Sequence, residues 1–296
     1  MTISRLIRPH TSGDVKVTPL LSIITPVYNG EKFILGCIES VVAQNCAGVE
    51  HIVVDGGSTD RTVQILREKA ETHPHLRWIS EPDSGQSDAL NKGIALARAE
   101  YIGILNVDDF YESGALCRVA GIIKNLHESR FIVGACNVLT TGDKLLHVNR
   151  PSVLKFENML VDDGVWPFPL NPAAYFYPKA VHDVVGTYNI EEHQVMDFEF
   201  ILAVVQAIEP LYIDVVLGNW RRIPGTKTFN SIEDGSLWPM MRRVRVAAWK
   251  RAPLKTKLRI ASLWISHRPY RLKVAYWDFR ALCRYWLMHP PSSGPE

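Results

Sequence analysis

Four short apolar segments in the first 110 residues are each followed by a polar turn. The turns are residues 25–29, 55–60, 81–86 and 106–109. If the apolar segments are strands of an open α/β sheet, the turns meet at the carboxyl edge, where ligands bind in such sheets. Ordinary turn and cap chemistry explains Asp60 and Ser84. It explains Asp55, Asp108 and Asp109 less well, because neighbouring carboxylates repel one another unless a cation or hydrogen-bond donors hold them.

Asp108 and Asp109 suit one particular chemistry. Oxygen ligands favour a hard cation such as Mg²⁺ or Mn²⁺, and a cation held by one or two carboxylates can bridge a substrate diphosphate. The sequence has neither G-x-G-x-x-G after its first apolar segment nor the phosphate-binding G-x-x-x-x-G-K-S/T. We therefore expect the cation to stabilise a nucleoside diphosphate as it leaves.

The elements that position these turns follow from the spacing of apolar residues. Strands are expected at 20–25, 51–55, 76–80, 101–106 and 131–136, alternating with helices at 31–43, 60–71, 87–99 and 114–126. Beyond these we expect a strand at 174–177, a helix at 196–207, a strand at 211–217 and three helical segments divided near Pro253 and Pro269. This order predicts an α/β fold with a mixed, mainly parallel sheet flanked by helices and a C-terminal helical appendage.

Composition narrows the function classes. The 296 residues are 47% hydrophobic, which allows a substantial core, and the formal net charge of +2 argues against a nucleic-acid-binding surface. The first residues contain no apolar run of signal-peptide length, and no stretch approaches the roughly 18 apolar residues of a membrane-spanning helix. A cytoplasmic protein is therefore expected.

The C-terminal region carries a local excess of positive charge. Between residues 240 and 290 there are thirteen lysines or arginines and one acid, Asp278, interleaved with Trp249, Trp264, Trp277 and Trp286. Such a pattern on amphipathic helices suits an anionic membrane surface, which would place the protein peripherally at the inner face of the cell membrane. Alternatively, the helices pack on the preceding domain and show only a solvated basic face. No nucleic-acid recognition motif accompanies the charge.

The polar turns lie within longer motifs, which are LSIITPVYNGEKFILGCIESVVAQ, HIVVDGGSTDRT, EPDSGQSDALNKGIALARAEYIGILNVDD and NPAAYFYPKAVHDVVGTYNIEEHQVMDFEF. In this order they resemble the family 2 glycosyltransferases, inverting enzymes of GT-A fold that include bacterial surface-polysaccharide transferases. The resemblance covers residues 20 to about 230. It implies transfer of a sugar from a nucleotide-diphosphate sugar to a hydroxyl acceptor, which is expected to be a lipid-linked or other glycan.

The resemblance also implies a donor site. Its residues are Thr25, Pro26, Tyr28, Asp55, Asp83, Lys92, Asn106, Val107 and Asp108. Within this set Asp108 is the implied metal ligand and Asp55 bonds the base. Two positions depart from the family pattern: Asn106, where many members have Asp, and Ile223, where many relatives have a His that can contact the diphosphate or metal.

The last motif contains the implied general base. With inversion in a single displacement, a carboxylate takes the proton from the attacking hydroxyl, and Asp197 is the expected residue. On its own Asp197 is equally typical of a helix cap, and Glu199 is the second choice. The pair Asp162–Asp163 precedes Gly164 and is read as a solvated turn.

Three segments are expected from these patterns. They are an N-terminal extension at 1–19, a catalytic domain at 20–237 and a basic, aromatic helical tail at 238–296. The catalytic domain divides into a nucleotide-binding half at 20–136 and an acceptor half at 137–237. Two other functions stay open on sequence alone: a metal-dependent nucleotidyltransferase, and a non-catalytic scaffold module that keeps the fold.

Overall fold

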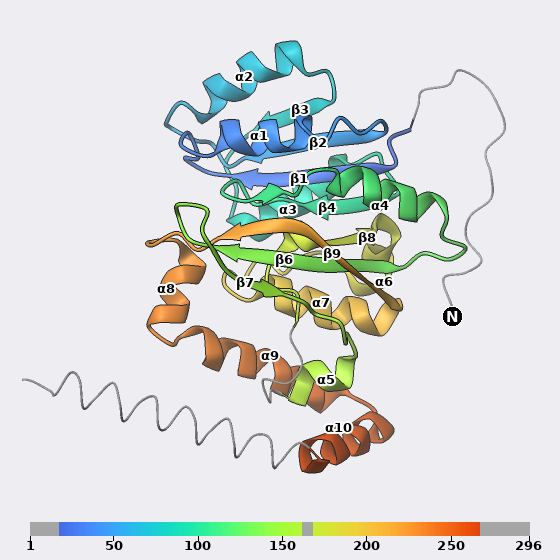
Figure 1. Ribbon diagram of the computed structural model, residues 1–296. Coiled ribbons are helices and arrows are strands. Elements are labelled where there is room, and N and C mark those ends of the chain that lie inside the picture. The colour runs from blue at the N-terminus through green and yellow to red at the C-terminus, as the bar shows by residue number, and fades with distance from the viewer. Residues whose placement is uncertain (1–17, 162–167, 267–296) are drawn as a thin grey trace, which may run out of the picture.

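The protein is described here from a computed structural model, which covers residues 18–161 and 168–266. The first half alternates strands and helices in the order β1 Leu21–Val27, α1 Ile34–Val42, β2 Val49–Asp55, α2 Thr62–Thr72, β3 Leu76–Ser80, α3 Gln86–Leu96, β4 Tyr101–Ile104, β5 Phe110–Tyr111, α4 Ala115–Lys124 and β6 Phe131–Leu139. Each strand and helix predicted up to residue 136 is present, with ends shifted by a few residues (Figure 1).

The second half is less regular. It contains β7 Leu145–Asn149, α5 Phe156–Val161, β8 Tyr175–Pro178, α6 His182–Val185, α7 Met196–Ala207, β9 Pro210–Arg221, α8 Lys227–Glu233, α9 Leu237–Arg251 and α10 Leu254–Ser266, with short 3₁₀ turns at Pro172–Ala174 and Lys179–Val181. The prediction missed β5, β7, α5, α6 and α8, which are too short to show a clear hydrophobic period. The third C-terminal helical segment, after Pro269, lies outside the described residues.

One sheet runs through both halves. Its order is β3-β2-β1-β4-β8-β6-β9-β5, with β7 paired to β6. The pairs among β3, β2, β1 and β4 are parallel, as is β6 with β9, whereas β8 is antiparallel to both β4 and β6. The predicted mixed, mainly parallel sheet is confirmed, and β8 is the strand that joins its two halves.

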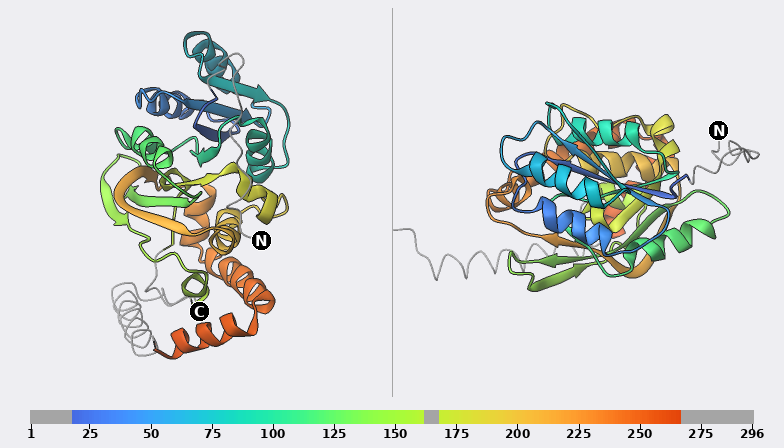
Figure 2. Two further views of the ribbon diagram at one scale, coloured as in Figure 1. Left: turned by 90° about the vertical axis from the view of Figure 1, so that its right-hand side faces the viewer. Right: turned by 90° about the horizontal axis from the view of Figure 1, so that it is seen from above.

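Side chains alternate along the strands and fill two layers of core. On β1, Ile23 packs toward α1 and α4, whereas Ile24 packs toward α3 and α7. The second layer also includes Met241 and Val244 of α9, so this helix buries part of its surface in the same core as the sheet. Figure 2 shows α9 leading from this core to α10, which lies farther from the sheet.

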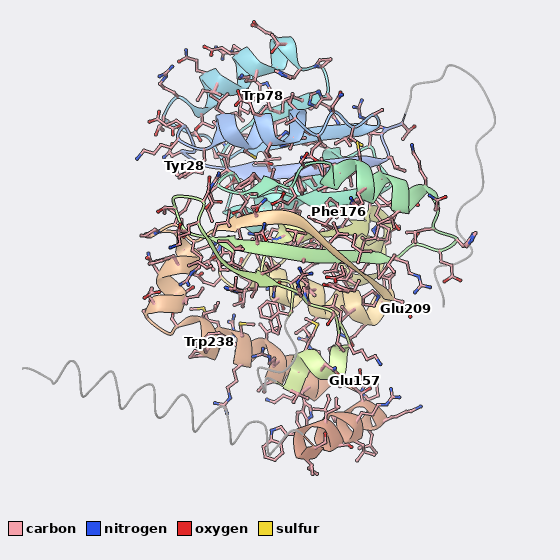
Figure 3. All side chains as sticks on the ribbon, in the orientation of Figure 1. Tyr28, Trp78, Glu157, Phe176, Glu209 and Trp238 are labelled. Atoms are coloured by element: carbon pink, nitrogen blue, oxygen red, sulfur yellow. The ribbon has the colours of Figure 1, made fainter. Side chains whose placement is uncertain are left out.

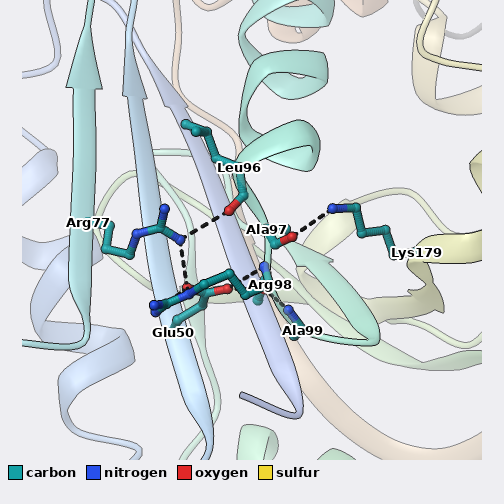
Figure 4. Close-up of polar contacts among 8 residues, drawn as sticks. Glu50, Arg77, Leu96, Ala97, Arg98, Ala99 and Lys179 are labelled. Atoms are coloured by element: carbon teal, nitrogen blue, oxygen red, sulfur yellow. Dashed lines mark hydrogen bonds and ion pairs between the residues drawn. The ribbon is translucent and has the colours of Figure 1, made fainter. Parts of the chain in front are cut away.

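A buried carboxylate ties the strands together at the amino-terminal edge of the sheet (Figure 4). Glu50 on β2 accepts hydrogen bonds from the Ser22 hydroxyl at 2.7 Å and the Arg98 amide at 2.8 Å. It also forms ion pairs with Arg77 on β3 and with the Arg98 guanidinium. The contacts join three strands and the loop before β4, so they fix the end of the sheet opposite the polar turns.

The C-terminal helices meet the body of the protein through charged contacts. Arg245 of α9 is buried, lies 4.9 Å from the ring centroid of Phe198 and donates to the Met159 carbonyl at 3.0 Å. Arg259 of α10 pairs with Glu157 of α5 at 3.4 Å. Within the part of the chain that the structure describes, no helix is long and apolar enough to span a membrane.

The Glu50 network generates a stability prediction. Glu50→Gln should lower the free energy of unfolding by about 2–3 kcal/mol, because a buried charged acceptor is lost while its donors stay in place. Urea denaturation monitored by circular dichroism measures the change. Glu39→Gln is the matched control, since Glu39 pairs with Lys69 at the surface and such pairs contribute about 0–1 kcal/mol. Equal losses in the two variants would contradict a special role for Glu50.

Candidate functional site

A cavity lies at the carboxyl edge of the sheet, as the polar turns predicted. It has a volume of about 350 Å³ and is lined by turns after β1, β3, β4 and β9 and by the segments before β8 and α7. Seven residues of the predicted site line it: Pro26, Tyr28, Asp83, Asn106, Val107, Asp108 and Asp197. Figure 3 shows the exposed ring of Tyr28 at the end of β1.

Three other predicted donor residues do not line the cavity. Thr25 is fully buried, and its hydroxyl lies 2.9 Å from Nε2 of His51. Lys92 of α3 pairs with Glu81 at 3.0 Å and donates to the Pro82 carbonyl at 2.9 Å. The contacts of Lys92 support the turn that carries Asp83. A direct contact of Thr25 or Lys92 with the donor stays a prediction.

Asp55, the third, organises its own turn. It is fully buried, and Oδ2 accepts from the amides of Gly57 at 3.1 Å and Ser58 at 3.0 Å and from the Ser80 hydroxyl at 2.7 Å. The Ser58 hydroxyl donates to the other oxygen. Both oxygens therefore have protein partners, and the predicted contact of Asp55 with the base stays untested.

Asp83 lies against the same turn. A Cβ atom added to Gly56 would stand 2.5 Å from Oδ2 of Asp83, so a larger residue at position 56 would require the Asp83 carboxylate to move. Oδ1 of Asp83 accepts from the Gly85 amide at 2.8 Å. The turn after β2 thus packs against the turn after β3, which lines the cavity.

Asp109 joins the two halves of the site. Its buried carboxylate accepts from Asn171 Nδ2 at 2.6 Å, from Asn106 Nδ2 at 3.2 Å and from the Arg221 amide at 3.0 Å. Burial raises the pKa of Asp109 to about 8, and the negative charge of Asp108 acts in the same direction. Because its oxygens are occupied in this way, Asp109 is a structural organiser, and Asp108 is the member of the pair that is partly exposed in the cavity.

The donor set can be tested against the implied Mg²⁺ or Mn²⁺. No cluster of three or more His, Cys, Asp or Glu side chains suited to a metal occurs in residues 18–161 and 168–266. A complete protein cage is thus not formed there. The carboxylate of Asp108 in an open polar cavity fits the other arrangement, in which Mg²⁺ takes one or two carboxylates and completes its shell with water and substrate phosphates.

Asp197 reaches the cavity from the acceptor half of the chain, at the first turn of α7. The Tyr175 hydroxyl of β8 lies 3.4 Å from its Oδ1. Burial raises the pKa of Asp197 to about 6, although the Tyr175 hydroxyl and the positive charge of Lys227 act to lower it. Glu199, the second choice, lines a separate crevice between α7 and α9 and not this cavity.

Several lining residues were not predicted, among them Gln86, Asn171, His193, Trp220 and Lys227. Lys227 follows the departure at Ile223 by four residues, and its position in the cavity depends on how the loop after β9 folds. Asn171 stands in a motif quoted for the family resemblance, which was a usable signal. The pair Asp162–Asp163 lies outside the described residues.

Comparisons with known proteins agree with this arrangement. The family model for glycosyl transferase family 2 matches residues 22–184. A PGL/p-HBAD biosynthesis glycosyltransferase of Mycobacterium bovis is 27% identical over 246 residues, which cover 82% of this chain and 87% of the relative. Chondroitin synthase of Escherichia coli is 42% identical over 105 residues, which cover 36% of this chain but only 15% of that protein.

Solved structures show the same fold. TarS of S. aureus, residues 1–349, has a TM-score of 0.62 and 19% identity, covering 83% of this chain and 70% of that one. The mannosyltransferase PcManGT from Pyrobaculum calidifontis, solved with GDP-Man and Mn²⁺, has a TM-score of 0.52 and 18% identity, covering 96% and 92%. The fold is therefore the expected GT-A type.

The family match and the named relatives define the class of this protein as a sugar-transferring enzyme. The chain belongs to glycosyl transferase family 2 and is a glycosyltransferase.

Proposed function

We propose that the cavity binds a nucleotide-diphosphate sugar and that the enzyme transfers the sugar, with inversion, to a hydroxyl acceptor. The observation that carries the proposal is that Asp108 and Asp197, which are 89 residues apart in the chain (197 minus 108), line the same cavity. A metal-binding carboxylate for the donor and a base for the acceptor are the two groups that such a reaction needs. Related solved structures hold UDP-GlcNAc or GDP-Man with Mn²⁺, which supports this class of donor.

Each side chain has a proposed task. Tyr28, with its exposed ring, and Pro26 line the end of the cavity that takes the nucleoside, and Asn106 offers an amide to the ribose. Asp108 would hold Mg²⁺ or Mn²⁺, which would neutralise charge on the diphosphate when bound. Asp197 takes the proton of the acceptor hydroxyl as its oxygen bonds to the anomeric carbon. The bond from that carbon to the phosphate oxygen breaks, and its electron pair leaves with the diphosphate.

The rival functions are less well supported. The hypothesis of a metal-dependent nucleotidyltransferase does not account for the match to the glycosyltransferase family model or for the relatives that are named glycosyltransferases. A non-catalytic module would be favoured by loss of Asp108 or Asp197, but both are present and both line the cavity.

The names of the relatives guide the choice of acceptor. One is a chondroitin synthase and another acts in PGL/p-HBAD biosynthesis, and the first of these names refers to a polysaccharide. We infer that the acceptor is a growing glycan, carried on a lipid, in polysaccharide biosynthesis. Such an acceptor would keep the enzyme at the inner face of the cell membrane.

The exposed faces of α9 and α10 support membrane attachment. From residue 237 to 266 there are eight lysines or arginines and no acid. Exposed apolar side chains accompany them: Trp238, Val246 and Trp249 on α9, and Leu254, Leu258, Trp264 and Ile265 on α10. Figure 3 shows Trp238 on the outer side of α9. Basic and apolar groups on helices at the edge of the molecule fit an anionic membrane surface. The domain boundary at residue 238 stays a proposal.

The proposed base generates a prediction for activity. Asp197→Asn should lower turnover by about 100-fold or more, the scale of a lost general base, while donor affinity stays nearly unchanged. In the wild type, activity should fall as the pH drops through about 6, because protonated Asp197 cannot accept a proton. The Tyr175 hydroxyl and the charge of Lys227 act on Asp197, and His193 lines the same cavity. The acid limb should vanish in the Asn variant.

The assay does not require a known acceptor. A panel of nucleotide sugars is first screened for metal-dependent thermal stabilisation, because ligand bound to the native state raises apparent stability. Release of nucleoside diphosphate, with water as the acceptor, is then measured across the pH range. Near-normal turnover of Asp197→Asn, together with a large loss in Glu199→Gln, would transfer the role of base to Glu199.

The membrane proposal is tested by co-sedimentation of the full-length protein with vesicles. Binding should require acidic lipid and weaken with added salt, since exposed charges are screened over roughly 8 Å at physiological ionic strength. Leu254→Ser with Leu258→Ser should weaken binding by removing two exposed apolar contacts on α10. The matched control is Leu145→Ser with Leu146→Ser on β7, where both leucines are also exposed. If the wild type ignores anionic vesicles at low salt, the C-terminal helices serve packing alone.

A further inference from the structure

The charges that line the cavity are strongly unbalanced. The carboxyl groups of Asp83, Asp108, Asp109 and Asp197 line it, and that of Asp109 is almost fully buried. Among the described lining residues, Lys227 is the only lysine or arginine. A diphosphate in this cavity would be repelled by the carboxylates unless positive charge stood close to it. One cation at Asp108 serves one side of the ligand, and among the described residues that line the cavity Lys227 is the one lysine or arginine that can serve another.

The ammonium group of Lys227 is not consumed by an internal ion pair. Nζ donates to the carbonyl of His193, which is a neutral partner. Within residues 18–161 and 168–266 no carboxylate forms an ion pair with it. The surrounding protein displaces water and lowers the pKa of Lys227, although the charges of Asp197 and Glu192 act in the opposite direction. The group therefore stands at the cavity with its charge only partly compensated.

The two acids whose charges act on Lys227 have other partners. Glu192 pairs with Arg243 of α9 and accepts from the amides of Gln194 at 3.0 Å and Val195 at 3.1 Å. Asp197 has the Tyr175 hydroxyl as its neighbour. Glu192 thus caps the segment that leads into α7 and does not serve as the counterion of Lys227.

The loop before Lys227 is short and anchored at both ends. The Arg221 amide donates to Asp109 at 3.0 Å, and the Arg222 amide donates to the Leu139 carbonyl at 2.9 Å. Gly225 has a φ of +86°, a left-handed conformation that favours glycine, and the Thr226 amide closes the turn on Ile223. The Asp109 carboxyl group therefore holds both the end of β9 and the turn that carries Asp108. The loop after β9 then places Lys227 at the cavity.

We propose that Lys227 binds the diphosphate of the donor and stabilises the negative charge that develops on the departing phosphate oxygen. This inference rests on the proposed function, since it assumes a diphosphate-bearing donor in this cavity. No proton is transferred: the ammonium acts as a charged hydrogen-bond donor, the kind of contact that phosphate oxygens accept most strongly. Lys227 and the Asp108 metal site would then hold the leaving group from two sides, while Asp197 faces the acceptor.

The test compares diphosphate with monophosphate binding. Titration calorimetry with Mn²⁺ present is run with UDP and UMP, and with GDP and GMP, and the pair whose diphosphate binds the wild type is used. Lys227→Met should weaken diphosphate binding by about 10- to 100-fold, the scale of a lost charged hydrogen bond, with a smaller effect on the monophosphate. Lys227→Arg should restore most of the affinity because it keeps the charge.

Two controls make the result specific. Lys124→Met removes an exposed lysine at the end of α4 and should leave both affinities unchanged. Thermal melting of Lys227→Met, matching the wild type, establishes that the variant is folded. An unchanged diphosphate affinity, or an equal loss for the two ligands, overturns the role of Lys227 and leaves the proposed function standing. A wild type that binds neither diphosphate overturns the proposed function itself, and this inference with it.

Discussion

The buried carboxylate of Asp109 is the contact on which the arrangement of the site depends. It joins the end of β4 to the segment before β8 and to the end of β9, through Asn106, Asn171 and the Arg221 amide. These elements come from both halves of the chain. A buried carboxyl group needs hydrogen-bond partners to offset its desolvation, and the partners of Asp109 come from different elements around the cavity. The turn with Asp108 and the loop with Lys227 are consequently held by one shared partner.

The acidic character of the cavity then sets its chemistry. Carboxylates clustered in a partly buried space favour ligands that bring or accompany cations, and they disfavour a bare anion. A nucleoside diphosphate with its metal ion meets this condition, and Lys227 adds a fixed charge of the protein itself. On the far side, the raised pKa of Asp197 brings this carboxyl group nearer to neutral pH, which suits proton transfer better than an ordinary exposed aspartate would. In the proposed mechanism, donor and acceptor chemistry are thus separated within one cavity.

Much of this was predictable from local sequence, and the rest was not. The strands up to β6 and the helix α7 show clear hydrophobic periods, and the carboxyl-edge rule then places Asp83 and Asp108 at one edge of the sheet. Asp197 was expected at the site only from the family resemblance, because it follows no strand and begins α7. Thr25 and Asp55 also lie at strand ends, yet their side chains are buried in hydrogen bonds, because sequence does not reveal which side of a turn a residue faces. The position of Lys227 depends on the pairing of β9 with β6 and on a turn at Gly225. Both are set by tertiary structure, so the sequence did not predict this position.

The location of the bound nucleotide and metal is the most direct measurement of the central claim. Crystals grown with Mn²⁺ and the nucleoside diphosphate that binds most tightly would reveal the metal by its anomalous scattering. The expected result is a Mn²⁺ peak bonded to a carboxylate oxygen of Asp108, with the diphosphate between that metal and Lys227 and the base beside Tyr28. A nucleotide bound outside this cavity, or a Mn²⁺ ion bonded to the diphosphate but remote from Asp108, would contradict it.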